Sequence, residues 1–190
     1  MVLARKTTLA AVCAVALALL AGCGNKTQGN NEGQAGAHSQ PGTEGLAVTL
    51  SGLEYTVYIT RELNLKIPPD QAYFNGPEAP PGQVYYGVFI QTCNPDGAPK
   101  PTADSFKVTD NQGNEFRPTP IEQKNPFAYH PRTLARKECI PQAGSVAQLG
   151  PTEASMLLFK LPLSNTENRP LELHIDAPRV AESKSIELDL

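Results

Sequence analysis

Residues 45–190 consist of short runs in which apolar and polar positions alternate, separated by prolines and polar turn residues. A period of two is typical of half-buried β-strands, and no long segment shows the 3.6-residue period of a helix. About seven short strands with polar turns predict an all-β domain, an antiparallel β-sandwich with long proline-rich loops. The strands are predicted over residues 46–59, 83–93, 105–109, 115–117, 155–161, 171–175 and 185–188.

Three local patterns refine this prediction. The run 83–93 is almost continuously apolar, which favours a central strand that is buried on both faces. Within residues 46–59 the apolar positions change parity at Ser51 and Gly52, which predicts a bulge or kink at Gly52. The segment Asp110–Asn114 is rich in Asn, Asp and Gly, so it is predicted to close a hairpin between the strands that flank it.

The first residues have the pattern of a secretory signal. Arg5 and Lys6 precede an apolar run over 9–20 that is too short to span a bilayer as a mature helix. The run ends in Leu-Ala-Gly-Cys at residues 20–23, which resembles the lipobox of bacterial lipoproteins. The resemblance implies that residues 1–22 are removed and that Cys23 carries diacylglycerol and anchors the chain to the membrane. The alternative is an ordinary signal peptide with an incidental cysteine.

The segment that follows is predicted to be a tether. Residues 24–44 contain five glycines and no Val, Ile, Leu, Met, Phe or Tyr, so they cannot form a core of their own. With Cys23 they make a flexible tether over 23–44, which reaches roughly 25 Å as a Gly-rich chain. The folded domain is therefore expected over residues 45–190.

Strand and turn motifs follow one another in the order Tyr85–Cys93, Ser105–Asp110, Gly113–Phe116, Gly150-Pro151, Met156–Pro162 and Pro170–Leu173. This order is similar to that of the telokin-like, immunoglobulin-like domain of unknown function found in lipoproteins of Gram-positive, actinobacterial-type bacteria. The resemblance implies an immunoglobulin-like β-sandwich on the extracytoplasmic face of the cell membrane and brings no catalytic residues. The chain departs from the family pattern in two proline-rich insertions, 61–82 and 118–149.

Two cysteines remain once Cys13 is cleaved away and Cys23 is lipidated. Cys93 and Cys139 would then lie outside the cytosol, where an even remainder of cysteines favours a disulfide. The alternatives are two buried thiols or a redox couple, although no Cys-x-x-Cys spacing is present.

Composition and charge exclude several classes of function. The formal charge is −3, and it becomes −5 after loss of Arg5 and Lys6, so there is no basic field for nucleic acid. No catalytic or phosphate-binding motif is present. His130, Cys139 and His174 come nearest to a copper set, but the usual methionine ligand is missing from it. The sequence therefore predicts neither enzyme activity nor a metal or cofactor, with a metal carrier or enzyme as the alternative.

Two loop segments are candidates for recognition of a partner. The first, within 124–137, is locally basic and aromatic and would suit an envelope protein or an anionic envelope polymer. The second is the insertion 61–82 with Tyr73 and Phe74. In both, the alternative is that the rings pack inward while the charges face solvent. The candidate partner-binding residues of the first segment are Phe127, Tyr129, His130, Arg132, Arg136 and Lys137. Together the patterns predict a lipid-anchored, non-catalytic binding or accessory module of the cell envelope.

Overall fold

The computed structural model of the protein describes residues 40–189. The predicted signal peptide (1–22), the lipidation site Cys23 and the tether up to residue 39 lie outside these residues. Within the described part, no helix has the length and apolar character needed to cross a membrane.

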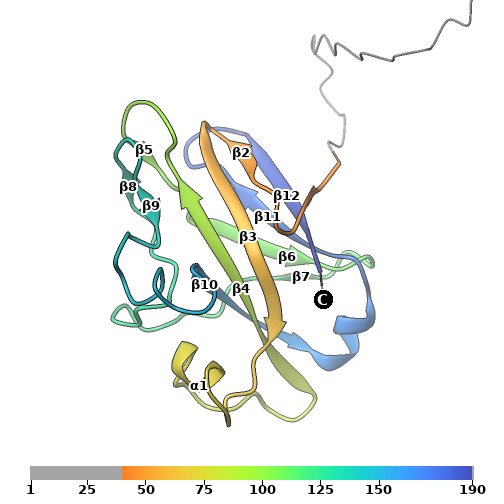
Figure 1. Ribbon diagram of the computed structural model, residues 1–190. Helices are drawn as coiled ribbons and strands as arrows, with labels where there is room; N and C mark the ends of the chain where they lie inside the picture. Colours follow the sequence, from red (N-terminus) through yellow and green to blue (C-terminus); the bar gives the residue numbers. More distant parts are fainter. Residues whose placement is uncertain (1–39, 190) are drawn as a thin grey trace, which may run out of the picture. The chain divides into compact units, whose positions relative to one another are not determined.

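Two main sheets pack face to face and form a β-sandwich, as predicted (Figure 1). The fold is immunoglobulin-like, and almost all of its strand pairs are antiparallel. The first sheet has the order β1(Gly42–Thr43), β12(Ser183–Leu188), β11(Leu171–Asp176), β6(Ser105–Thr109) and β7(Glu115–Phe116). The second has the order β10(Ser155–Pro162), β4(Gln83–Cys93), β3(Leu53–Glu62) and β2(Val48–Leu50). The short elements are β5(Lys100–Pro101) paired with β8(Thr133–Leu134), β9(Cys139–Ile140) paired with β4, α1(Asp70–Tyr73) and the 3₁₀ helix η1(Leu163–Glu167).

The main core lies between the two sheets and follows the period-two pattern of the sequence. Tyr86, Val88 and Ile90 of β4 point inward, and they belong to the same buried cluster as Phe159 of β10 and Leu173 of β11. Since successive side chains of a strand point to opposite faces, the residues between them are directed to the outer face of the second sheet.

The outer face of β4 is buried as well, which confirms the prediction of a central strand over residues 83–93. Tyr85 and Phe89 lie in a second buried cluster together with Tyr73 from one proline-rich insertion and Phe127 from the other. The Tyr73 ring packs edge-on against Phe89 and against Phe127, with centroid distances of 4.8 and 4.9 Å. The two insertions therefore form an additional layer over the second sheet.

The change of parity near Gly52 has a different cause from the predicted bulge. Ser51 and Gly52 have φ values of 51° and 74° and form a two-residue turn between the paired residues Leu50 and Leu53. Positive φ at both central residues matches the twist of a hairpin, so the chain reverses direction here and β2 and β3 are separate strands. The irregularity within β3 lies further along, between Val57 and Ile59.

The folded domain begins before residue 45, which corrects the predicted end of the tether. Gly42 and Thr43 form β1, which pairs in parallel with β12 and leaves β12 inside the sheet rather than at its edge. The Glu44 carboxylate then accepts hydrogen bonds from the backbone N–H groups of Thr60 and Asp189, at 3.0 and 3.2 Å. The segment joins the sheet through backbone pairing, which needs no apolar side chain, so its composition gave no sign of it.

The hairpin predicted around Asp110–Asn114 is present, since β6 and β7 flank it and pair with each other. Asp110 accepts backbone hydrogen bonds within the turn, at 3.0 Å from Gln112 and 2.8 Å from Asn114. The carboxylate therefore stabilises the turn from inside.

Candidate functional site beside the disulfide

Cys93 and Cys139 form a disulfide, as predicted. Cys93 ends β4 and Cys139 begins β9, and the two residues face each other in the register of the paired strands, with a Cα–Cα distance of 4.1 Å. Because Cys139 is bonded to Cys93, it is not a free thiolate for the copper set considered from the sequence. The disulfide joins the insertion 118–149 to the central strand.

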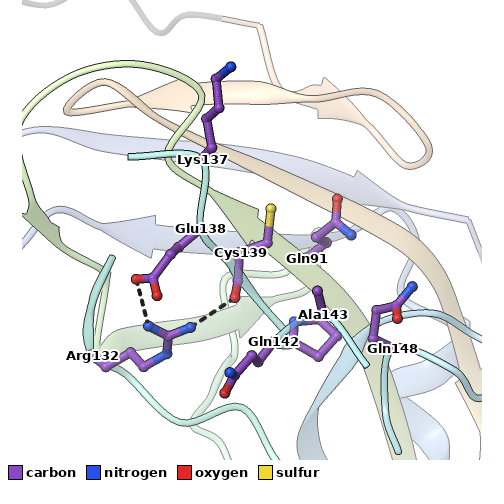
Figure 2. A pocket seen from close by; sticks show the side chains of 9 residues that line it. Gln91, Arg132, Lys137, Glu138, Cys139, Gln142, Ala143 and Gln148 are labelled. Carbon is purple, nitrogen blue, oxygen red and sulfur yellow. Dashed lines mark hydrogen bonds and ion pairs between the residues drawn. The ribbon is translucent and has the colours of Figure 1, made fainter. Parts of the chain in front are cut away.

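A pocket of about 380 Å³ opens beside this disulfide (Figure 2). Its size lies within the range of small-ligand sites in proteins. β4 supplies one wall, and the rest comes from the chain between Arg132, just before β8, and the segment that follows β9. It is lined by Gln91, Arg132, Lys137, Glu138, Cys139, Pro141, Gln142, Ala143 and Gln148.

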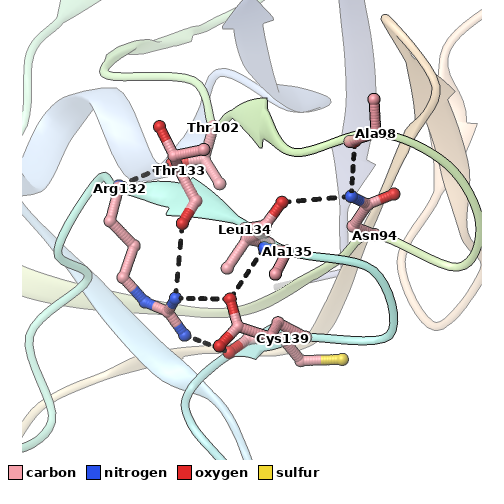
Figure 3. Close-up of polar contacts among 9 residues, drawn as sticks. Asn94, Ala98, Thr102, Arg132, Thr133, Leu134, Ala135 and Cys139 are labelled. Carbon is pink, nitrogen blue, oxygen red and sulfur yellow. Dashed lines mark hydrogen bonds and ion pairs between the residues drawn. The ribbon is translucent and has the colours of Figure 1, made fainter.

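An ion pair fixes one side of the pocket (Figures 2 and 3). Arg132 donates from Nη1 to a Glu138 carboxylate oxygen at 3.1 Å and from Nη2 to the Cys139 carbonyl oxygen at 3.0 Å. The same Glu138 oxygen accepts the backbone N–H of Ala135 at 2.7 Å. The Ala135 hydrogen bond first, and Arg132 second, hold the pKa of Glu138 below its usual value of 4.5. Glu138 is therefore ionised at neutral pH and balances the charge of Arg132.

The loop that carries Lys137 is held from the other side by Asn94 (Figure 3). This residue is fully buried, and its side-chain amide donates to the carbonyl oxygens of Ala98 and Leu134, each at 3.1 Å. Its backbone accepts the Lys137 N–H at 2.8 Å and donates to the Glu138 carbonyl oxygen at 2.9 Å. These contacts fix Lys137 at a φ of 62°, in the left-handed region.

The pocket presents an excess of hydrogen-bond donors. The side-chain oxygen of Gln148 accepts the backbone N–H of Gly144 at 3.1 Å, and that of Gln91 accepts the Tyr58 hydroxyl at 2.9 Å. Each of these glutamines therefore keeps its NH₂ group for another partner. The Lys137 side chain forms neither an ion pair nor a hydrogen bond with any of residues 40–189, and it extends from the rim of the pocket (Figure 2).

The structure does not form the basic, aromatic patch predicted within 124–137. Phe127 is only 9% exposed, because its ring covers the outer face of the second sheet. Tyr129 is 8% exposed, because its ring lies in the main core. Arg136 forms an ion pair with Asp96 at 2.8 Å, and His130 lies against the Asn125 carbonyl oxygen at 3.3 Å. The alternative reading, in which the rings pack inward, is the one observed.

The second candidate segment, 61–82, gives the same result, since Tyr73 and Phe74 are both buried. Of the six predicted partner-binding residues, Arg132 and Lys137 line the pocket. Sequence reasoning missed its three glutamines and Glu138. Gln142 and Gln148 lie close to Arg132 in the chain, but Gln91 reaches the pocket only through the pairing of β4 with β9.

No group of three or more His, Cys, Asp or Glu side chains within residues 40–189 is arranged to hold a metal ion. The arrangement described above is suited to binding through hydrogen bonds and charge.

Comparison with known proteins adds little beyond the fold. No protein family matches the chain, and no curated protein does. The chain is similar to the solved structure of the YjhA protein from Bacillus subtilis, at 10% identity over 78% of this chain and 99% of that one, with a TM-score of 0.49. It is also similar to an uncharacterized β-sandwich protein from Clostridium difficile 630, at 12% identity over 83% of this chain and 100% of that one, with a TM-score of 0.46.

Proposed function

We propose that this protein is a lipid-anchored, extracytoplasmic module that binds another component of the cell envelope without catalysing a reaction. The observation that carries the proposal is the combination of a lipobox-like Leu-Ala-Gly-Cys at residues 20–23 with a disulfide in the domain that follows. Disulfides persist in oxidising compartments outside the cytosol, so both features point to the same location.

The distance between the proposed anchor and the domain fits this role. Between Cys23 and residue 42, where β1 begins, lies a Gly-, Asn- and Gln-rich segment. A Gly-rich chain of about 18 residues has a root-mean-square reach of roughly 20–25 Å, which would carry the domain clear of the lipid headgroups. Two acyl chains would hold it there stably, because each buried methylene contributes about 0.8 kcal/mol.

The binding role rests on the pocket beside the disulfide. Within residues 40–189, its lining offers two glutamine NH₂ groups and a lysine amine that have no partner, and such groups recognise a polar ligand. A loop fixed by a disulfide and a buried asparagine presents these groups in one arrangement, which lowers the entropy cost of binding.

Metabolic labelling with a palmitate analogue in the native host tests the anchoring. The parent chain is expected to take up label and to sediment with membranes, and Cys23→Ala is expected to lose both. The matched control is Cys13→Ala, which removes a cysteine from the predicted signal peptide and should leave labelling unchanged. Equal labelling of the parent and Cys23→Ala would overturn the proposed anchor.

A further inference from the structure

We propose that the pocket beside the Cys93–Cys139 disulfide binds the free carboxyl terminus of a short peptide. The inference rests on the proposed binding role of the domain and names the ligand class. A cavity of about 380 Å³ has room for a segment of about two small residues.

The charge of the lining favours an anion. Only three of its residues are charged, and two of them, Arg132 and Glu138, neutralise each other at 3.1 Å. Lys137 is left as the one uncompensated charge of the lining, on a chain whose formal charge is −3. A carboxylate that enters the pocket therefore meets a net positive charge.

The neutral side chains favour a ligand rich in oxygen acceptors. Gln91 and Gln148 have their oxygens engaged by Tyr58 and Gly144, so their NH₂ groups are the ends left for a ligand. A peptide that ends in a carboxylate carries two charged oxygens and a carbonyl oxygen one residue earlier, which matches two amide donors in a pocket that has a lysine at its rim. The Gln142 amide can pair with the peptide N–H through its own oxygen.

The residues of the lining also favour a peptide over a sugar acid as the ligand. None of the nine residues that line this pocket is aromatic. Sugar rings are commonly recognised by stacking on aromatic faces, whereas the terminal carboxylate of a peptide is captured by hydrogen-bond donors. Among ligands with a carboxylate, the pocket is therefore better suited to a peptide.

The backbone at Lys137 supports a role for its amine. A φ of 62° costs a lysine conformational energy that glycine avoids and that asparagine tolerates well. The backbone hydrogen bonds to Asn94 hold the chain in this conformation at residue 137. A glycine or an asparagine would adopt it at a lower energetic cost than lysine does. A strained residue with an unpaired amine at the rim of a pocket is consistent with selection for binding rather than for stability.

The test is an NMR titration of the ¹⁵N-labelled full chain, purified as the host processes it, with acetyl-Ala-Ala and with its C-terminal amide. We expect the free acid to shift the resonances of Lys137 and of the pocket glutamines with a Kd on the order of 1 mM, and the amide to bind at least about fivefold more weakly. Lys137→Asn should weaken binding of the acid about fivefold while its melting temperature is equal to or above that of the parent.

Two further variants make the titration specific. Lys124→Asn makes the same change in charge at an exposed lysine outside the pocket, and it should bind like the parent. Glu138→Gln removes the counter-charge of Arg132 while keeping an oxygen that can accept from Ala135, and it should tighten binding of the acid about threefold.

Several results would overturn the inference. These are equal binding of the acid and the amide, unchanged binding by a folded Lys137→Asn, or tighter binding of glucuronate than of the peptide acid. A chain that takes up palmitate label but does not bind the peptide acid would overturn only this inference. A chain that binds the acid but takes up no label would overturn only the proposed anchor.

Discussion

Asp110 is the most densely hydrogen-bonded carboxylate described in the domain, and its removal is expected to cost a large share of the stability. It is 5% exposed and joins the β6–β7 hairpin to the 3₁₀ helix η1. One oxygen accepts the two backbone N–H groups of the turn, and the other accepts three side-chain amides, from Asn114 at 2.7 Å, Asn168 at 2.9 Å and Asn165 at 3.0 Å.

The expected magnitude follows from these bonds. A hydrogen bond to a charged group contributes about 1.5–3 kcal/mol, but the effects of neighbouring bonds do not add. In Asp110→Ala several of the freed amides lie near solvent and can find water in place of the carboxylate. We therefore expect Asp110→Ala to lower the free energy of unfolding at pH 7 by about 3–4 kcal/mol.

The effect should depend on pH in a defined direction. Burial alone would raise the pKa of Asp110, but the hydrogen bonds from Asn114, Asn165 and Asn168 outweigh it and hold the pKa well below its usual value of 3.8. Because the pKa is lower in the folded state than in the unfolded state, the stabilisation is complete above about pH 5 and declines as the pH falls below the unfolded pKa near 4. The difference between the parent and Asp110→Ala should therefore shrink by about 1–2 kcal/mol between pH 7 and pH 3.

Urea unfolding at pH 7, 5 and 3, followed by far-UV circular dichroism, measures this difference directly. Asp104→Ala is the matched control, because Asp104 lies at the other end of β6 and is exposed, and it should change stability by less than about 0.5 kcal/mol. A cost below 1 kcal/mol for Asp110→Ala at pH 7, or a cost that does not change with pH, would refute the reasoning.

Three other changes test separate parts of the structure. Replacing both Cys93 and Cys139 with serine should cost about 4 kcal/mol in urea unfolding, since the disulfide closes a loop across a sequence separation of 46, and a reductant should bring the parent to the same value. Tyr73→Phe should leave the stability of the domain unchanged or raise it by up to about 1 kcal/mol in thermal melts, because the buried Tyr73 hydroxyl has no hydrogen-bond partner within residues 40–189. A loss of stability above about 1 kcal/mol would show that the hydroxyl has a partner in solution. Gly87→Ala should cost about 1–3 kcal/mol in urea unfolding, because an added methyl would lie 2.9 Å from the Phe89 ring, and an unchanged value would show that the second cluster is loosely packed.

Regular alternation made the sandwich itself predictable. The strand at 83–93 and the hairpin around Asp110 were both predicted, because in each case local residue patterns and tertiary packing favour the same structure. The disulfide was predictable from counting cysteines, although the pairing of β4 with β9 that aligns Cys93 and Cys139 was not.

The predictions that failed have a common physical reason. A parity change at Ser51 is produced equally by a bulge and by a two-residue turn, and only the partner strand tells them apart. Phe127 and Tyr129 were considered as surface residues because their own segment has no periodicity, yet they are buried by strands distant in the chain. In the same way, the pocket depends on Gln91, which lies about 40 residues from Arg132 in the sequence.

The insertions that bury the candidate aromatic residues also produce the pocket. Without them, Tyr85 and Phe89 on the outer face of β4 would lose the residues of the insertions that cover them. The buried cluster and the pocket meet between two neighbouring residues of one segment. Ala147 is buried in the second cluster, and Gln148 lines the pocket. On the proposed binding role, substitutions in the 141–148 segment would change what the pocket binds while the cluster that holds the segment in place is kept. Ligand specificity and stability of the sandwich would then be carried by different residues of the same insertion, as expected for recognition loops on a rigid scaffold.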